Sequence, residues 1–154
     1  QILYLLATYW NKEARLQGGV AGTLMTNLGV ENALKAKGVS FVRTAVGDKY
    51  LMRALVENNW YLGAEGSGHI LCMDRIKTGD GIVAALQVLE ALIVQKQTLK
   101  NVLEELRLYP QVLINVRVVN RDVIDNDDIK VLIQESEDLL GEKGRILVRA
   151  SGTE

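Results

Sequence analysis

Apolar segments of two different periods alternate along the first half of the chain, and this alternation limits the possible folds more than any other feature. Short apolar runs, typical of buried strands, are separated by segments whose apolar residues recur every three to four positions, as in helices. The expected strands are 20–26, 39–45, 60–63 and 70–73, and the expected helices are 2–15, 30–37 and 48–58. This order predicts an α/β layer on a largely parallel sheet, with functional groups at the carboxyl ends of the strands.

A long apolar helix is expected after Asp80, which is placed to cap it. Apolar side chains occupy both of its faces: Ile82, Leu86, Leu89 and Ile93 on one, and Val83, Val88, Leu92 and Val94 on the other. A helix that is apolar around so much of its circumference is expected to be covered on several sides, as at a junction between domains.

The pattern changes downstream of this helix. Pro110 ends a helix that Thr98 caps, and apolar residues at every second position of 112–119 predict a half-exposed strand of an antiparallel sheet. The acidic run 125–128 favours the start of a further helix, which Gly141 ends, and an apolar run near the end of the chain predicts a last strand. The second half is therefore predicted to be an α+β structure.

Length and composition narrow the class of protein. The chain has 154 residues, which suits one ordinary domain or two small ones. With 18 basic and 19 acidic side chains, it has no positive excess for a nucleic-acid partner. Its apolar runs are far shorter than the roughly 20 residues of a membrane helix, so no membrane partner is expected. Its single cysteine cannot form an internal disulfide and its first residues do not open a signal peptide, so a cytoplasmic location is expected.

We predict three parts on these grounds. Residues 1–80 form a mixed, mostly parallel α/β/α layer, and residues 81–97 form a bridging helix. Residues 98–154 form a partial α+β domain with an antiparallel sheet.

The loop 64–69 combines a carboxylate, a hydroxyl and an imidazole with several glycines. Glu65 can accept hydrogen bonds from two adjacent hydroxyls, and Ser67 can both donate and accept. Glycines allow the backbone to approach a ligand closely, and His69 closes the loop. This set suits a polyol such as a sugar; the alternative is a surface hairpin that glycines turn.

Two other segments carry groups that bind anions. The arginine after the last apolar run offers a bidentate fork to phosphate, and the polar turn that follows can complete an anion nest. These candidate phosphate ligands are Arg149, Ser151, Gly152 and Thr153. Lys49 adds a charge at a helix start, where anions are attracted, although Asp48 as a helix cap explains the same segment. An ordinary polar turn stays the alternative for the first segment.

Three other features are not predicted to act chemically. The glycines of 18–22 precede a strand instead of following one, which is the wrong order for a nucleotide loop. The acidic run 125–128 lacks the ligand spacing of a calcium loop. Cys72 has no CxxC partner and lies in an apolar strand, so we expect a buried and inert thiol.

Taken together, the motifs resemble the α-D-phosphohexomutase superfamily. Glu65-Gly66-Ser67-Gly68-His69, Thr78-Gly79-Asp80-Gly81-Ile82-Val83-Ala84, Tyr109-Pro110-Gln111-Val112 and Arg149-Ala150-Ser151-Gly152-Thr153-Glu154 occur here in the order and at about the spacing of that superfamily. The segment Val46-Gly47-Asp48-Lys49-Tyr50 and the form of the last motif are similar to its phosphoglucosamine mutase branch. A phosphomannomutase or phosphoglucomutase is the alternative within the superfamily.

The resemblance implies roles for the candidate residues. Glu65 and Ser67 match the sugar-recognition loop of the family's third domain, which His69 closes, and Lys49 matches a segment that lines the cleft. Arg149, Ser151, Gly152 and Thr153 match the fourth-domain loop that holds the phosphate not being transferred. The implied substrates are hexosamine phosphates: glucosamine 6-phosphate is converted to glucosamine 1-phosphate through a bisphosphorylated sugar, for cell-wall precursor synthesis.

The resemblance also implies parts that this sequence does not contain. The family's phosphoserine loop and its Asp-Gly-Asp-Gly-Asp-Arg magnesium loop are absent, so no catalytic residue and no metal ligand is predicted here. Phosphoryl transfer needs both positioning and a metal that neutralises charge, so Mg²⁺ is expected in the parent enzyme and no turnover from these residues alone. The uncapped start and the halt at Glu154 predict a piece of a four-domain protein. Homo-oligomerisation and a non-catalytic sugar-phosphate-binding module stay open.

Overall fold

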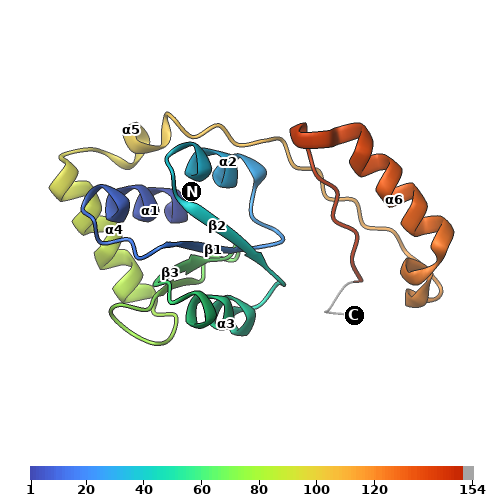
Figure 1. The fold of residues 1–154 in the computed structure, drawn as a ribbon, viewed down its shortest axis with the longest axis horizontal. Coiled ribbons are helices and arrows are strands. Elements are labelled where there is room, and N and C mark those ends of the chain that lie inside the picture. The colour runs from blue at the N-terminus through green and yellow to red at the C-terminus, as the bar shows by residue number, and fades with distance from the viewer. Residues whose placement is uncertain (151–154) are drawn as a thin grey trace. The chain divides into compact units, whose positions relative to one another are not determined.

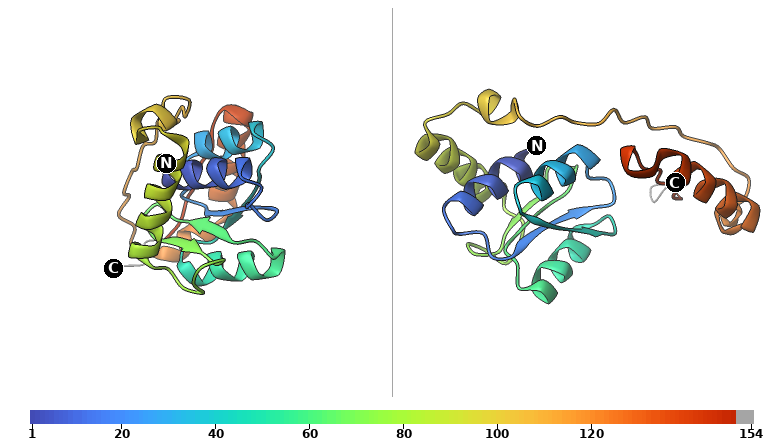
Figure 2. Two further views of the ribbon diagram at one scale, coloured as in Figure 1. Left: turned by 90° about the vertical axis from the view of Figure 1, so that its left-hand side faces the viewer. Right: turned by 45° about the horizontal axis from the view of Figure 1, so that its top comes forward.

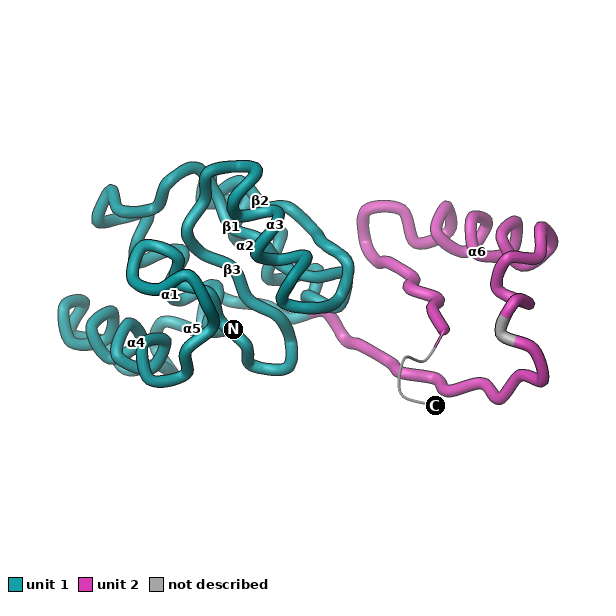
Figure 3. The backbone as a smooth tube through the Cα atoms, turned by 90° about the horizontal axis from the view of Figure 1, so that it is seen from below, with its two compact units in different colours: residues 1–108 teal, residues 109–154 magenta. Residues whose placement is uncertain are grey.

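The computed structural model describes residues 1–150, with Arg121 described by its backbone alone. It contains two compact units: unit 1 is Gln1–Leu108 and unit 2 is Tyr109–Glu154 (Figure 3). The division comes about ten residues after the predicted start of the second part at residue 98. Unit 1 extends past this point because the chain after the long helix still packs on it and buries Leu106.

Unit 1 is built on one four-stranded sheet. Its strands are β1 (Gly19–Thr23), β2 (Ser40–Thr44), β3 (Leu62–Ala64) and β4 (Ile70–Cys72). The order across the sheet is β2-β1-β3-β4, and β1 runs parallel to both of its neighbours. Only β4 is antiparallel, paired with β3. The predicted mixed, mostly parallel α/β layer is confirmed.

Helices cover both faces of this sheet. They are α1 (Ile2–Lys12), α2 (Leu28–Ala36), α3 (Asp48–Asn58), α4 (Gly81–Gln95) and α5 (Leu99–Leu103). Helices α1 and α2 lie on one face with α4 beside them, and α3 lies alone on the other (Figures 1 and 2). Across residues 1–150, the structure has no helix with the length and apolarity to cross a membrane.

Side-chain caps begin most of these helices. Asp80 accepts hydrogen bonds from the backbone N–H groups of Ile82 and Val83, at 2.8 and 2.9 Å, so its predicted role at the start of α4 is confirmed. The predicted cap at Thr98 is also confirmed. Asp48 is different: Gly47 is the cap residue, with a left-handed φ of 126°, and Asp48 is the first residue of α3.

The core has two parts, one on each side of the sheet. Because successive strand residues point to opposite faces, Val20 packs with α1 and α2, whereas its neighbour Ala21 packs with α3. Helix α1 lies in the middle of the larger part. Seven of its eleven residues are buried, so it is covered on most of its circumference.

Of the two apolar faces expected on helix α4, one packs on the core of unit 1 and the other is exposed. Its buried residues are Ala84, Gln87 and Ala91, and small side chains there allow close approach to α1 and β4. Val83, Val88 and Leu92 of one expected face pack against the core, whereas the residues of the other face are exposed: Ile82 at 75%, Leu86 at 57%, Leu89 at 53% and Ile93 at 72%. Within unit 1 alone, α4 is therefore covered on one apolar face and open on the other. Apolar periodicity identified the helix correctly but could not rank its two apolar faces.

The regular secondary structure in the described part of unit 2 consists of helices and helical turns. It contains a 3₁₀ turn, the helix α6 and a second 3₁₀ turn, at Arg121–Asp125, Asp127–Leu140 and Gly141–Lys143. The acidic start of α6 is confirmed, with Asn126 as its cap. The strands predicted at 112–119 and near 146–149 do not form over residues 109–150. A strand requires a hydrogen-bonded partner, and the described segments of this unit do not supply one.

Cys72 is buried in β4, as expected, and burial raises the pKa of its thiol to about 11. Relative to an ordinary thiol with a pKa of 9.0, about a hundredfold less thiolate is present near pH 8. We expect Ellman's reagent to label Cys72 at least about tenfold more slowly in buffer than in 8 M urea, because only the thiolate reacts. Equal labelling rates in both solvents would contradict the buried position.

Candidate functional site

The candidate site lies at the carboxyl edge of the parallel strands. Because β1, β2 and β3 run in the same direction, the segments that follow them emerge at one edge of the sheet. Lys49 comes shortly after β2, at the start of α3, and Glu65 directly follows β3. Strand β1 lies between these strands, so the two segments are about two strand spacings apart, roughly 10 Å.

The β3–β4 connection is a tight turn with a defined shape. The backbone N–H of Glu65 donates to the carbonyl of His69 at 3.0 Å, and the N–H of Gly68 donates to the carbonyl of Glu65 at 3.1 Å. Gly68 has a left-handed φ of 94°, which favours glycine at this position. We call residues 65–69 the sugar loop, after the role proposed for it below.

Within this loop the two predicted polar side chains contact each other. The hydroxyl of Ser67 donates to Oε1 of Glu65 at 2.9 Å. Ser67 is exposed and Glu65 is half-buried. A carboxylate has two oxygens with about four acceptor positions, so this bond leaves capacity for hydroxyl donors from a ligand. Because its only proton is donated to Glu65, the Ser67 oxygen adds further acceptor positions, so the pair presents several acceptors at one point to the hydroxyl donors of a sugar.

His69 packs against a turn that the sequence analysis used only as a helix start. A β-carbon on Gly79 would lie 2.0 Å from Cε1 and 2.2 Å from Nε2 of the His69 imidazole. The ring therefore occupies the space in which a side chain at position 79 would lie. The Thr78-Gly79-Asp80-Gly81 motif is thus next to the sugar loop, a contact that residue patterns alone do not indicate.

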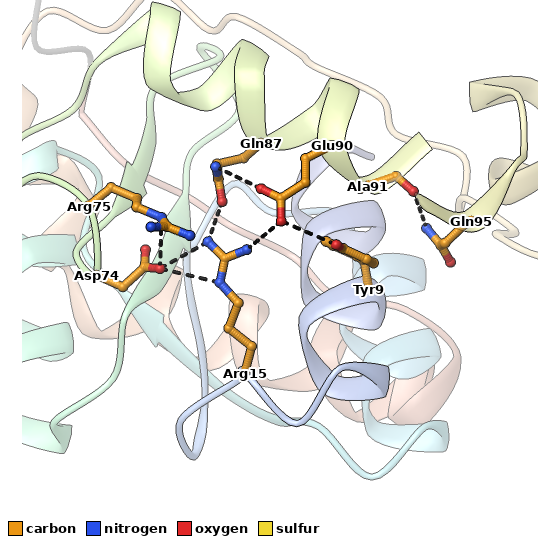
Figure 4. Close-up of polar contacts among 8 residues, drawn as sticks. All are labelled: Tyr9, Arg15, Asp74, Arg75, Gln87, Glu90, Ala91 and Gln95. Carbon is orange, nitrogen blue, oxygen red and sulfur yellow. Dashed lines mark hydrogen bonds and ion pairs between the residues drawn. The ribbon is translucent and has the colours of Figure 1, made fainter. Parts of the chain in front are cut away.

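A network around Arg15 fixes the chain between the sugar loop and α4 (Figure 4). The Arg15 guanidinium pairs with Asp74, just after β4, at 2.9 Å, and with Glu90 on α4 at 3.1 Å. It also donates to Gln87 of α4, and the Tyr9 hydroxyl donates to Glu90 at 3.2 Å. These bonds link the α1–β1 connection to Asp74, shortly after β4, and to the middle of α4.

The turn after the central strand β1 is a neighbour of the site that the sequence analysis did not single out. Arg43 of β2 holds it by donating to the carbonyls of Thr23 and Thr26, at 3.1 and 2.9 Å. Arg43 also donates to Glu31 at 2.7 Å. Although burial opposes the shift, hydrogen bonds from Lys35 and Arg43 lower the pKa of Glu31. Arg43, the charged residue of a short strand, was the signal that could have indicated this turn.

The predicted site residues are not all brought together. Glu65, Ser67 and His69 share one loop. Lys49 is exposed and its Nζ lies 4.8 Å from the ring centroid of Tyr50. Arg149 is exposed in unit 2, and Ser151, Gly152 and Thr153 lie outside the described residues.

A polar pocket of about 340 Å³ lies elsewhere in unit 1 and contains none of the predicted site residues. Lys37 and Glu105 form an ion pair in it at 2.9 Å. The hydrogen bond between them raises the pKa of Lys37 and lowers that of Glu105. Among the residues that the structure describes, no group of three or more His, Cys, Asp or Glu side chains could hold a metal ion.

Comparison with known proteins identifies the family. The model of "Phosphoglucomutase/phosphomannomutase, alpha/beta/alpha domain III" matches residues 1–109, and that of the C-terminal domain of the same family matches residues 113–154. The chain belongs to the phosphoglucomutase/phosphomannomutase family.

Its curated relatives include phosphoglucosamine mutases. The chain is 53% identical to that of Hydrogenovibrio crunogenus and 49% identical to that of Vibrio cholerae, each over 100% of this chain. The matches cover 34% and 35% of those relatives, so the chain spans about a third of their length.

The fold is also found among solved structures. A structure of Aspergillus fumigatus N-acetylphosphoglucosamine mutase in complex with GlcNAc-6P and magnesium matches 99% of this chain and 40% of its own, with a TM-score of 0.79 and 24% identity.

Proposed function

We propose that this chain supplies substrate-binding loops of a phosphoglucosamine mutase, which interconverts glucosamine 6-phosphate and glucosamine 1-phosphate. The Ser67–Glu65 hydrogen bond carries this proposal, because it fixes a carboxylate and a hydroxyl oxygen side by side as acceptors for sugar hydroxyls at the carboxyl edge of an α/β sheet. The names of relatives about half identical to this chain support the same activity. The enzyme is proposed to be cytoplasmic.

The sugar loop binds the ring, in this proposal. The Glu65 carboxylate accepts hydrogen bonds from adjacent ring hydroxyls or from the amino group, which is positively charged in glucosamine phosphates. Ser67 orients the carboxylate and offers a hydroxyl of its own. His69 contributes a nitrogen from the closed end of the loop, and Lys49 supplies a positive charge at the other side of β1.

The phosphate that is not being transferred is assigned to the second unit. Arg149 offers its planar fork to two phosphate oxygens, and Ser151, Gly152 and Thr153 supply a hydroxyl or backbone N–H donor each. A sugar that reacts at both ends must be released, turned and bound again. A loop that holds either end by its phosphate serves both orientations.

The chemical step is proposed to use groups outside this sequence. A phosphoserine carries the phosphoryl group to the sugar, which passes through a bisphosphorylated state. Mg²⁺ is the implied cofactor, but the residues described here do not form a group of side chains that fits it. We therefore propose that the 154 residues bind and orient substrate only as part of a longer polypeptide, whose association into homo-oligomers stays open.

The proposal is tested on a polypeptide that joins this chain to the phosphoserine and magnesium loops. The turnover of glucosamine, glucose and mannose 6-phosphates is compared, in each case with Mg²⁺. We expect the highest kcat/KM for glucosamine 6-phosphate. A preference for glucose or mannose 6-phosphate would assign the chain to a phosphoglucomutase or phosphomannomutase instead.

Calorimetry on the 154-residue chain tests the remaining alternative, a stand-alone binding module. We expect no micromolar binding of glucosamine phosphates, because this chain does not contain the phosphoserine and magnesium loops of the proposed site. Micromolar binding together with no turnover in the longer polypeptide would favour a non-catalytic sugar-phosphate-binding domain.

A further inference from the structure

Gly79 stands where any larger residue would displace the imidazole of His69. A β-carbon at this position would lie 2.0 Å from Cε1, 2.2 Å from Nε2 and 2.8 Å from Nδ1 of the ring. Real β-carbons do not approach other atoms so closely. The backbone of Gly79 is not in the left-handed region, so what it provides is space and not an unusual conformation.

The segment that carries Gly79 has polar contacts near both of its ends, which oppose its movement away from the ring. At one end Asp74 is paired with Arg15 at 2.9 Å. At the other, the Asp80 side chain accepts from two N–H groups of α4, at 2.8 and 2.9 Å. If position 79 carried a methyl group, the His69 ring would therefore have to move instead.

Gly79 is a close neighbour of the His69 ring, whereas two glycines of the ring's own loop stand in open space. The loop contains Gly66 and Gly68, and a β-carbon on either one would meet no other atom within 4 Å. The imidazole can rotate about two side-chain bonds, and a fixed neighbour reduces the number of orientations it adopts. A ligand then meets a ring that is already oriented, so less conformational freedom is lost on binding.

We propose that Gly79 is a positioning residue for the sugar site: it holds the imidazole of His69 in the orientation in which it meets the substrate beside Glu65 and Ser67. The expected effect of Gly79 on activity rests on the proposed function, whereas its effect on the orientation of the His69 ring does not. It gives Gly79 a role of its own, beside the capping of α4 by the neighbouring Asp80.

The structural content is tested on the 154-residue chain by NMR. His69 is the only histidine of the sequence, so its Hε1 and Hδ2 signals are unambiguous. We expect nuclear Overhauser contacts from Gly79 Hα to the His69 ring, and loss of these contacts with a shift of both ring signals in Gly79→Ala. Gly81→Ala is the matched control, because a β-carbon at Gly81 meets nothing within 4 Å. Unchanged ring signals in Gly79→Ala would overturn the proposal.

The functional content is tested by a double-mutant cycle in the longer polypeptide. We expect Gly79→Ala to lower kcat/KM for glucosamine 6-phosphate at least about fivefold, and Gly81→Ala to leave it unchanged. In a His69→Ala background, Gly79→Ala should cause no further loss, because there is no ring left to displace. Equal losses in both backgrounds would show an ordinary structural effect and overturn the positioning role.

The two tests separate this inference from the proposed function. If no hexose phosphate is turned over by the unmodified longer polypeptide, the proposed function fails, while the NMR result still decides whether Gly79 fixes the ring. If turnover is found and Gly79→Ala retains full activity despite a displaced ring, the proposed function stands and the positioning role is wrong.

Discussion

Replacing Glu65 with alanine in the longer polypeptide lowers kcat/KM for glucosamine 6-phosphate by at least about tenfold, or 1.4 kcal/mol, in our expectation. The substitution removes the carboxylate acceptor of the sugar loop. It also removes the partner of the Ser67 hydroxyl, which donates to Glu65 at 2.9 Å in the unmodified chain. Arg149→Ala has an effect of the same size, because a lost bidentate fork to phosphate is a lost charge-assisted hydrogen bond. Steady-state kinetics with saturating Mg²⁺ measures both.

Glu57→Ala is the control for this experiment. It removes the same carboxylate from an exposed position in the last turn of α3, a helix that begins after β2 at the carboxyl edge of the sheet and runs away from it, and should leave the kinetics within about twofold. If the loss of a negative charge alone reduced activity, kcat/KM would fall equally in Glu57→Ala and Glu65→Ala. Unchanged kinetics in both Glu65→Ala and Arg149→Ala would remove the assignment of these residues to the substrate site.

Leu5→Ala is expected to destabilise unit 1 by about 3 kcal/mol, the largest effect that we predict on stability. Leu5 has no exposed surface and lies on α1, which is packed between the sheet, α2 and α4. The change removes apolar contacts and leaves a cavity that this densely packed helix cannot close. Urea unfolding measures the effect, and tryptophan fluorescence reports on unit 1 alone, because both tryptophans, Trp10 and Trp60, belong to it.

Leu86→Ala provides the comparison. It makes the same change on a helix of the same unit, but the Leu86 side chain is 57% exposed, so the free energy of unfolding should change by about 0.5 kcal/mol or less. A similar loss of stability in both variants would mean that α4 is covered in solution on the face that the structure leaves open.

Much of unit 1 could be predicted from sequence because its signals are local. Strand and helix periods and the caps at Asp80 and Thr98 all act within a few residues of where they occur. The parallel sheet then follows from the alternation of strands and helices. The sugar loop was predicted for the same reason, since Glu65 and Ser67 are two positions apart and contact each other in the turn.

What could not be predicted depends on contacts between distant residues. The packing of His69 on Gly79 and the links from Arg15 to Asp74 and Glu90 join segments that no local pattern connects. The choice between the two apolar faces of α4 depends on which face fits beside α1, and small alanines decided it. The predicted strand at 112–119 depends on partners, and alternation alone cannot supply them.

The exposed apolar face of α4 also affects how the isolated chain is expected to behave at high concentration. Four exposed residues follow one another at intervals of four, three and four positions: Ile82, Leu86, Leu89 and Ile93. They form a continuous apolar stripe along the helix. Attraction between such stripes on separate molecules grows with concentration. Self-association, more than thermal unfolding, is therefore expected to limit the concentration at which the isolated chain stays in solution. Leu86→Glu is the simplest substitution to raise that concentration.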